Sequence, residues 1–191
     1  MPVTPTSRRT RWLVALLLIG WATSVVLAFW WYQGRYVQRF GDQPALFYGQ
    51  HLALPKALMD TSRIRVVHFH NPACPCEQAT QIHLAELLKR FAGKVDFFVL
   101  TAPGTQAMLE PALNTLPQLH QLPGSEHLPA SPSVAIWDTQ NHLAYLGPYS
   151  EGAVCSIDGS LIEPVLDALL TGRQVSASST LASACLCPWP Q

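Results

Sequence analysis

Charged side chains are scarce in this sequence. Lysine and arginine number 12 and aspartate and glutamate number 12 in 191 residues, so the formal net charge is zero. No run of basic residues occurs, whereas a surface that binds nucleic acid needs clustered positive charge to hold phosphates. We therefore expect no nucleic-acid partner.

Paired acidic residues of the kind that general acid–base catalysis uses are also lacking. Glu86, Glu110 and Glu163 show no paired arrangement that indicates catalysis. Apolar residues, in contrast, make up 49% of the sequence. The roughly 150 residues after the N-terminal segment are enough for one domain with a hydrophobic core.

One stretch near the N-terminus contains no charge. Residues 12–32 are long enough as a helix to cross a hydrocarbon core of about 30 Å. Trp12 lies at one end and Trp30, Trp31 and Tyr32 at the other, where aromatic side chains meet the membrane surface. Because the apolar core of a cleaved signal peptide has about 7–15 residues, we expect an uncleaved anchor, with a cleaved signal as the alternative.

The arginines that flank this span indicate its orientation. Arg8, Arg9 and Arg11 precede it, whereas Arg35 and Arg39 follow it. An excess of positive charge favours the cytoplasmic side of a membrane, so we expect the N-terminus in the cytoplasm. The C-terminal domain would then lie in an oxidising compartment, where disulfides persist.

The most informative stretch combines a strand, a turn and two cysteines. β-Branched and aromatic residues predict a strand over 64–70, and the turn signal Asn71-Pro72 follows it. Cys74-Pro75-Cys76 then opens a helix predicted over 76–92, because its apolar residues recur with helical spacing. Thiols at a helix N-terminus lie near the positive end of the helix dipole, which lowers the pKa of cysteine. We therefore expect reactive cysteines here.

Further strands and helices are predicted after this stretch. A strand over 95–100 completes a βαβ unit with parallel strands. Residues 105–120 are expected to form a helix interrupted by prolines, and a proline-rich loop follows. Two short strands over 133–137 and 142–146 form an antiparallel hairpin. An amphipathic helix over 162–170 closes this part of the chain.

This order, βαβ followed by ββα, resembles the thioredoxin fold, an α/β fold with a mixed sheet flanked by helices. Residues 68–76 stand where thioredoxins have an aromatic strand end followed by Cys-Gly-Pro-Cys. Ser131-Pro132-Ser133-Val134 stands where they have a cis-proline before a strand, and residues 147–152 stand in the loop before the last helix. In thioredoxins these three loops converge on the active site. The resemblance therefore implies that Pro132 shapes the site beside Cys74 and Cys76.

The whole chain also resembles an uncharacterised family of bacterial membrane-anchored thioredoxin-like proteins. That resemblance implies a single-pass protein of the bacterial inner membrane whose C-terminal domain is periplasmic. The expected parts are a cytoplasmic N-terminus at 1–11, a transmembrane anchor at 12–32, a linker at 33–61, a thioredoxin-like domain at 62–172 and a cysteine-containing tail at 173–191.

The cysteine motif departs from that of thioredoxin. If Pro75 and Cys76 align with the end of Cys-Gly-Pro-Cys, Ala73 replaces the attacking cysteine; if the loop is one residue shorter, Cys74 is the nucleophile. In either alignment a disulfide between residues i and i+2 closes a small ring that fits disulfide geometry poorly. Such a bond is strained and oxidising, or another cysteine is the partner. The candidate accessory thiols are Cys155, Cys185 and Cys187.

The C-terminal tail is long enough to supply such a partner. At up to about 3.3 Å per residue, the chain after Gly172 can reach back over more than about 40 Å. We expect the sulfur of Cys185 or Cys187 within about 10 Å of Cys74 or Cys76, and Trp189 as the residue that packs the tail on the domain. Because five cysteines are an odd number, at least one is free or paired outside the chain.

Three functional hypotheses follow. The first is thiol–disulfide exchange with periplasmic protein thiols and disulfides, with Cys74, Cys76 and Pro132 at the site and no cofactor. The second is a protein that holds copper or zinc on the thiolates of two Cys-x-Cys pairs, whose spacing is unlike common zinc signatures. Its ligands would be Cys74, Cys76, Cys185 and Cys187. The third is a non-catalytic thioredoxin-like scaffold stapled by disulfides.

His68 and His70 alternate on the predicted strand and should share one face of it. They lie near the thiols in sequence, so they are possible neighbours of a metal site. We expect them instead to be packed or hydrogen-bonded in place.

The uncharged span predicts that the N-terminal helix stays attached and that the domain is exported. A reporter that is active only in the periplasm, fused after residue 172, should give signal in the membrane fraction. A soluble mature product that begins near residues 25–35 would instead identify a cleaved signal peptide.

Overall fold

The structure is a computed structural model in which the chain divides into two units, Met1–Arg35 and Tyr36–Gln191. It describes residues 8–40, 52–59, 61–106, 108–152, 159–175, 177–178 and 182–190. Helix α1 spans Arg8–Tyr36, and none of its residues is buried. Within the described part of the chain it is the one helix long and apolar enough to cross a membrane.

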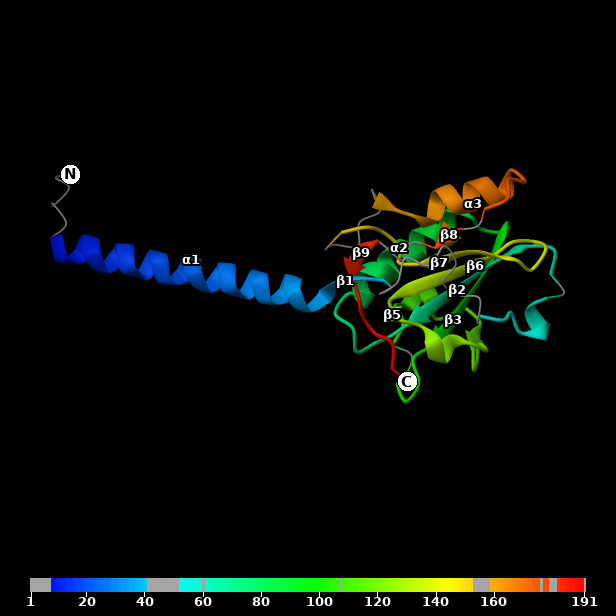
Figure 1. The fold of residues 1–191 in the computed structure, drawn as a ribbon, viewed down its shortest axis with the longest axis horizontal. Helices are drawn as coiled ribbons and strands as arrows, with labels where there is room; N and C mark the ends of the chain where they lie inside the picture. The colour runs from blue at the N-terminus through cyan, green and yellow to red at the C-terminus, as the bar shows by residue number, and fades with distance from the viewer. Residues whose placement is uncertain are drawn as a thin grey trace. The chain divides into compact units, whose positions relative to one another are not determined.

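The second unit is built on a six-stranded mixed sheet with the strand order β4-β3-β2-β6-β7-β8 (Figure 1). Strands β2 and β3 are parallel and are joined by helix α2, whereas β6 and β7 form an antiparallel hairpin that precedes helix α3. This arrangement confirms the predicted βαβ and ββα units and the thioredoxin-like fold. The bounds are β2 Ile64–His70, α2 Glu77–Arg90, β3 Val95–Thr101, β4 Gln118–Leu119, β6 Ser133–Trp137, β7 Leu143–Gly147, α3 Ile162–Leu170 and β8 Ala177–Ser178.

The two faces of the sheet are covered differently. Successive side chains of a strand point to opposite faces, so the fully buried strand β2 contributes to two separate clusters. On one face Ile64 and Val66 pack with leucines of α2 and with Ile162 and Leu166 of α3. On the other face Val67 and Phe69 pack against irregular segments and the end of the chain: Phe40, Leu52, Leu54, Leu58, Leu122, Leu128, Leu186 and Trp189.

The end of the chain forms strands of its own. Strand β9, Ser183–Cys185, pairs antiparallel with β1, Val37–Arg39, and strand β10, Cys187–Pro188, pairs antiparallel with β5, Ala130–Ser131. A single 3₁₀ turn, η1 at Lys56–Leu58, places Leu58 in the core. The compact unit therefore begins at Tyr36 and includes the tail, so it is wider than the expected range 62–172.

The interrupted helix predicted over 105–120 is wrong. The described residues of that range contain one 3₁₀ turn, η2 at Pro111–Leu113, and strand β4. A further 3₁₀ turn, η3 at Ser125–His127, lies in the loop beyond it. Pro111 and Pro117 each remove a backbone donor and clash with the preceding turn, and in so short a segment that prevents a helix.

Arg65 is fully buried in β2 although it carries a charge. Its guanidinium donates from Nη1 to the carbonyl oxygens of Thr61 and Arg63 at 3.1 and 2.7 Å. From Nη2 it donates to the carbonyl oxygen of Asp138 and to Oδ1 of Asn141, at 2.5 and 2.6 Å. The hydrogen bonds of Arg65 therefore link the turn between β6 and β7 to the start of β2.

Replacing Arg65 should destabilise the domain. In Arg65→Met, four oxygens lose a buried donor, and we expect the free energy of unfolding to fall by about 3 kcal/mol. The matched control is Arg63→Met, because Arg63 is exposed and forms only a surface ion pair with Asp96 at 3.1 Å. That change should cost about 0.5 kcal/mol or less. Denaturant unfolding of the full chain in detergent measures both, and equal losses would contradict this role.

Candidate functional site

Two disulfides join the loop before α2 to the end of the chain. Cys74 is bonded to Cys187, and Cys76 is bonded to Cys185, with Cα–Cα distances of 5.8 and 5.7 Å. The predicted approach of the tail cysteines is confirmed. The i, i+2 bond is not formed, and each cysteine of the Cys-Pro-Cys motif takes its partner from the other end of the domain.

A tight turn positions the two N-terminal cysteines. Oδ1 of Asn71 accepts the N–H of Ala73 at 3.1 Å, and the carbonyl oxygen of Asn71 accepts the N–H of Cys74 at 3.0 Å. Asparagine favours such turns because its side chain mimics a backbone carbonyl. Cys76 is the N-cap residue of α2, so the helix begins at Glu77 rather than at Cys76. The turn thus holds Cys74 just before the helix and Cys76 at its start.

The predicted cis-proline lies against this turn. The Ser131–Pro132 peptide bond is cis, and Pro132 is buried between β5 and β6. Sγ of Cys74 lies 3.7 Å from the carbonyl oxygen of Ser131, and the side chain of Asn71 donates to Oγ of Ser131 at 3.1 Å. The structure therefore brings together Cys74, Cys76, Pro132, Cys185 and Cys187. Cys155 lies outside the described residues.

The four cysteines differ in exposure. Cys74, Cys76 and Cys185 are 4%, 3% and 3% exposed, and they form a buried cluster. Cys187 is only half-buried and packs against that cluster. The Cys74–Cys187 disulfide is therefore the less buried of the two.

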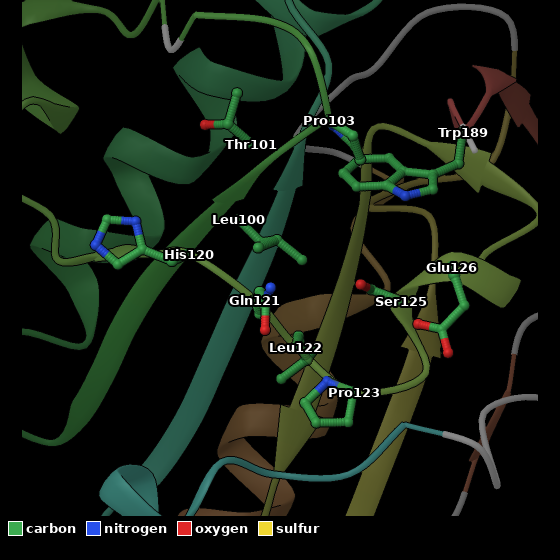
Figure 2. A pocket seen from close by; sticks show the side chains of 10 residues that line it. All are labelled: Leu100, Thr101, Pro103, His120, Gln121, Leu122, Pro123, Ser125, Glu126 and Trp189. Carbon is green, nitrogen blue, oxygen red and sulfur yellow. The ribbon is translucent and has the colours of Figure 1, made fainter.

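Trp189 holds the end of the chain in place, as expected. Its ring meets that of Phe69 edge-on, with centroids 5.8 Å apart, and the residue is 5% exposed. Trp189 also lines a cavity of about 520 Å³ together with residues 100, 101, 103, 120–123, 125 and 126 (Figure 2). In Figure 2 its indole lies beside Pro103, with the side chains of Gln121, Ser125 and Glu126 farther along the cavity.

The thiol ligands of the metal hypothesis are close together but oxidised. The sulfurs of Cys74, Cys76 and Cys187 lie within 4.8 Å of one another, and Cys185 is bonded to Cys76. Copper and zinc bind cysteine as thiolate, so both disulfides would have to be reduced before this set could hold an ion. The grouping fits a soft metal only in the reduced state.

A buried polar cluster lies beneath the cysteines. Oε1 of Glu77 lies 2.8 Å from Nε2 of His68 and 2.7 Å from Nδ1 of His70, and Oε2 accepts the N–H of Asn71 at 3.1 Å. The hydroxyl of Tyr149, from the third loop of the thioredoxin resemblance, lies 3.0 Å from Nδ1 of His68. The two histidines share one face of β2, as predicted, and they are hydrogen-bonded in place.

Sequence reasoning missed Glu77. A pattern of paired acidic residues does not indicate it, because this carboxylate pairs with histidines from the preceding strand. Its signal was its position in the first turn of the helix, directly after Cys76, with two histidines alternating on the strand before it.

The histidines control the ionisation of Glu77. Burial by itself raises the pKa of this carboxyl, but the charge of His68 and hydrogen bonds from His68 and His70 lower the pKa to about 2, from an ordinary value of 4.5. The carboxylate therefore stays ionised although it is 3% exposed. One negative charge is thus fixed at the N-terminus of α2, where the helix dipole favours it.

Lowering the pH should destabilise the folded domain by protonating Glu77. A carboxyl with a lowered pKa stabilises the fold above its unfolded pKa, and that stabilisation is lost as the pH falls from about 5 to about 2. The contribution at neutral pH is about 3 kcal/mol. Glu77→Gln should therefore be less stable at neutral pH and lose less stability on acidification.

The matched control for this prediction is Glu86→Gln, because Glu86 is an exposed carboxylate on the same helix. Its stability should follow that of the unchanged chain over the whole pH range. Chemical unfolding of the full chain at pH values between about 3 and 7 measures all three. An acid dependence that is the same in Glu77→Gln as in the unchanged chain would contradict the assignment.

Solved structures with the same fold support the architecture. A crystal structure of an uncharacterized conserved protein from Geobacillus kaustophilus is 16% identical, with a TM-score of 0.56; 82% of this chain and 88% of that chain are covered. A hypothetical protein, SMc02350 from Sinorhizobium meliloti 1021, is 15% identical with a TM-score of 0.55, over 81% of this chain and 93% of that one. These identities show a shared fold alone.

A third structure, of a thioredoxin-like protein in its oxidized form, is 12% identical with a TM-score of 0.48, over 72% of this chain and 98% of that one. No curated protein matches the sequence. A family model described as a domain of unknown function, DUF6436, matches residues 43–189. This range is well over half of the chain, and the protein therefore belongs to the DUF6436 family.

Proposed function

We propose that the protein is a membrane-anchored thiol–disulfide exchange protein whose reactive bond is Cys74–Cys187. One observation carries this proposal: Cys74, just before α2 and beside the cis-proline loop, is bonded to Cys187, the one cysteine of the described cluster that is only half-buried. A purely structural bond needs no exposed partner, whereas exchange needs a sulfur that an incoming group can reach.

The exchange has two balanced steps. In the reduced protein, the Cys74 thiolate attacks a disulfide of the partner, forms a mixed disulfide and releases the first partner thiol. The Cys187 thiolate then attacks Sγ of Cys74, which re-forms Cys74–Cys187 and releases the second partner thiol. Two electrons pass from the protein to the partner disulfide.

The surroundings of Cys74 support this chemistry. The residue precedes α2, whose first backbone N–H groups favour a thiolate nearby. Pro132 has no N–H, so it adds no competing donor beside the sulfur. Its neighbour Ser131 has its carbonyl oxygen 3.7 Å from Sγ, so the cis-proline loop is in direct contact with this sulfur.

The second disulfide has a different role in this proposal. Both cysteines of the Cys76–Cys185 disulfide are buried, and Cys185 lies two residues before Cys187 in the tail. It therefore acts as a fixed point that keeps Cys187 within reach of Cys74 when the outer bond opens. Exchange at the outer bond does not require the inner bond to open.

The proposed location of the protein, anchored in the membrane with its domain in the periplasm, rests on α1 and on the cysteine chemistry. The helix is long and apolar enough to anchor the chain, and the arginines at its start favour a cytoplasmic N-terminus. The domain would then be periplasmic on the bacterial inner membrane, where disulfides persist. Its partners are protein thiols and disulfides of that compartment.

Two cysteine substitutions separate the reactive bond from the fixed one. In the full chain purified in detergent, Cys74→Ser should abolish insulin-disulfide reduction, because no nucleophile remains beside Pro132. Cys187→Ser should stall the reaction at the mixed disulfide on Cys74, since the resolving thiol is gone. Non-reducing electrophoresis with peptide mapping detects that adduct.

The matched control is Cys185→Ser, which removes the other tail sulfur. It should keep partial activity and accumulate no mixed disulfide on Cys74. Full activity in Cys74→Ser, or an adduct on Cys76 in place of Cys74, would overturn the assignment of the reactive bond.

A second function is favoured by one specific observation, the three sulfurs within 4.8 Å of one another. In the reduced state these thiolates and Cys185 fit Cu(I) or Zn²⁺. This alternative predicts little reductase activity, and copper or zinc that co-purifies under reducing conditions and is lost in the double variant Cys74→Ser/Cys76→Ser. The absence of both activity and metal would leave the disulfide-stapled scaffold as the function.

A further inference from the structure

Residues near the end of the chain pair with strand β5 in the manner of a bound peptide. Cys187 pairs with Ser131 and Pro188 with Ala130 in a short antiparallel ladder, while Cys187 is covalently bonded to Cys74. An extended segment that adds to an exposed strand gains affinity from backbone hydrogen bonds and specificity from alternate side chains. We call residues 187–189 the terminal strand segment.

We propose that the terminal strand segment is an internal substrate. It occupies the position where a partner protein binds, and its sequence shows which residues the site recognises. A partner presents an extended segment whose cysteine takes the place of Cys187 and whose aromatic residue, two positions later, takes the place of Trp189. This inference rests on the proposed exchange at Cys74 and adds the class of segment that enters the site.

The burial of the segment supports this recognition rule. Cys187 is half-buried, Pro188 is exposed and Trp189 is 5% exposed, which is the alternation of a strand on a surface. The first and third positions therefore contact the domain, whereas the middle position faces solvent. Trp189 packs on Phe69 within the core cluster that covers one face of the sheet.

The site around Trp189 has space for a partner's aromatic side chain. The cavity of about 520 Å³ opens beside the indole and is lined by apolar Leu100, Pro103 and Leu122, with polar Gln121 and Glu126 (Figure 2). Because the indole does not fill this space, a different aromatic ring and the residues after it can be accommodated. Thr101, His120 and Ser125 also line it, so the cavity offers hydrogen-bonding groups beside its apolar surface.

The segment can leave without disturbing the rest of the tail. Strand β9 is held by its ladder to β1 and by Cys76–Cys185, and the N–H of Leu186 donates to the carbonyl oxygen of Tyr36 at 2.8 Å. Beyond Leu186 the segment is held by the two-residue ladder to β5, the outer disulfide and Trp189. Reduction of the outer disulfide removes the one covalent restraint beyond Leu186.

Tail and partner exclude each other, because both need the β5 edge and Sγ of Cys74. A partner disulfide enters when Cys74 and Cys187 are reduced, and Cys74 forms the mixed disulfide described above. Return of the terminal strand segment to β5 then brings the Cys187 thiolate to Cys74. The same movement displaces the bound peptide and releases its thiol.

A pair of peptides tests the recognition rule. The protein is the full-length Cys187→Ser variant with Cys76–Cys185 kept oxidised, so Cys74 has no disulfide partner and the tail cannot close covalently on it. Each peptide carries one cysteine activated as its disulfide with thionitrobenzoate, and release of the coloured leaving group gives the rate. The sequences are Gly-Cys-Pro-Trp-Pro and Gly-Cys-Pro-Ala-Pro.

Below saturation, the tryptophan peptide should form its disulfide with Cys74 about tenfold faster than the alanine peptide, because burial of the ring favours its docking. A third peptide, Gly-Cys-Ala-Trp-Pro, should react as fast as the first, since the middle position faces solvent. Adding Trp189→Ala to the protein should speed the tryptophan peptide several-fold by removing the competing ring.

The outcomes separate this inference from the proposed function. Equal rates for the tryptophan and alanine peptides, with Cys74 as the labelled residue, would overturn the internal-substrate inference and leave exchange at Cys74 intact. Absence of any adduct on Cys74, established by peptide mapping against Cys74→Ser, would overturn the proposed function as well. A rate unchanged by Trp189→Ala would show that the tail does not compete for the site.

Discussion

The two disulfides between the start of α2 and the last residues of the chain are the constraint on which the rest of the domain depends. They close loops with sequence separations of 113 and 109 residues, and one such loop closure stabilises a fold by about 4–5 kcal/mol in the chain-entropy model. They also hold β9 and β10 on their partner strands and bring Trp189 to Phe69. Without them, one face of the sheet would lose much of its cover.

A buried polar cluster of Glu77, His68 and His70 lies next to the cysteines. Glu77 receives hydrogen bonds from two histidines of β2 and from the backbone of Asn71, and this arrangement keeps its carboxylate ionised at 3% exposure. The same turn positions Cys74 and is fastened to Ser131. The buried charge of Glu77 and the loop beside Pro132 are therefore linked through the turn that holds Cys74. A change in any of them alters the surroundings of Cys74.

Much of the fold could be predicted because its elements are local. Strand β2, the helix after the cysteines, the β6–β7 hairpin and α3 each have a periodic pattern of apolar residues, and all lie close to their predicted bounds. The segment 105–120 has a mixed pattern, and its two prolines exclude the predicted helix instead of only interrupting it. The strands of the tail are only two or three residues long, too short for a pattern to indicate them.

The residues alone predict a strand that runs into two cysteines at a helix start, a proline before a second strand, and an uncharged span before the domain. The disulfide partners, the half-buried position of Cys187 and the contact of Glu77 with His68 and His70 depend on the folded arrangement. The difference lies in distance along the chain. Periodicity reports the environment of neighbouring residues, whereas disulfide partners more than 100 positions apart are chosen by how the sheet and the tail pack.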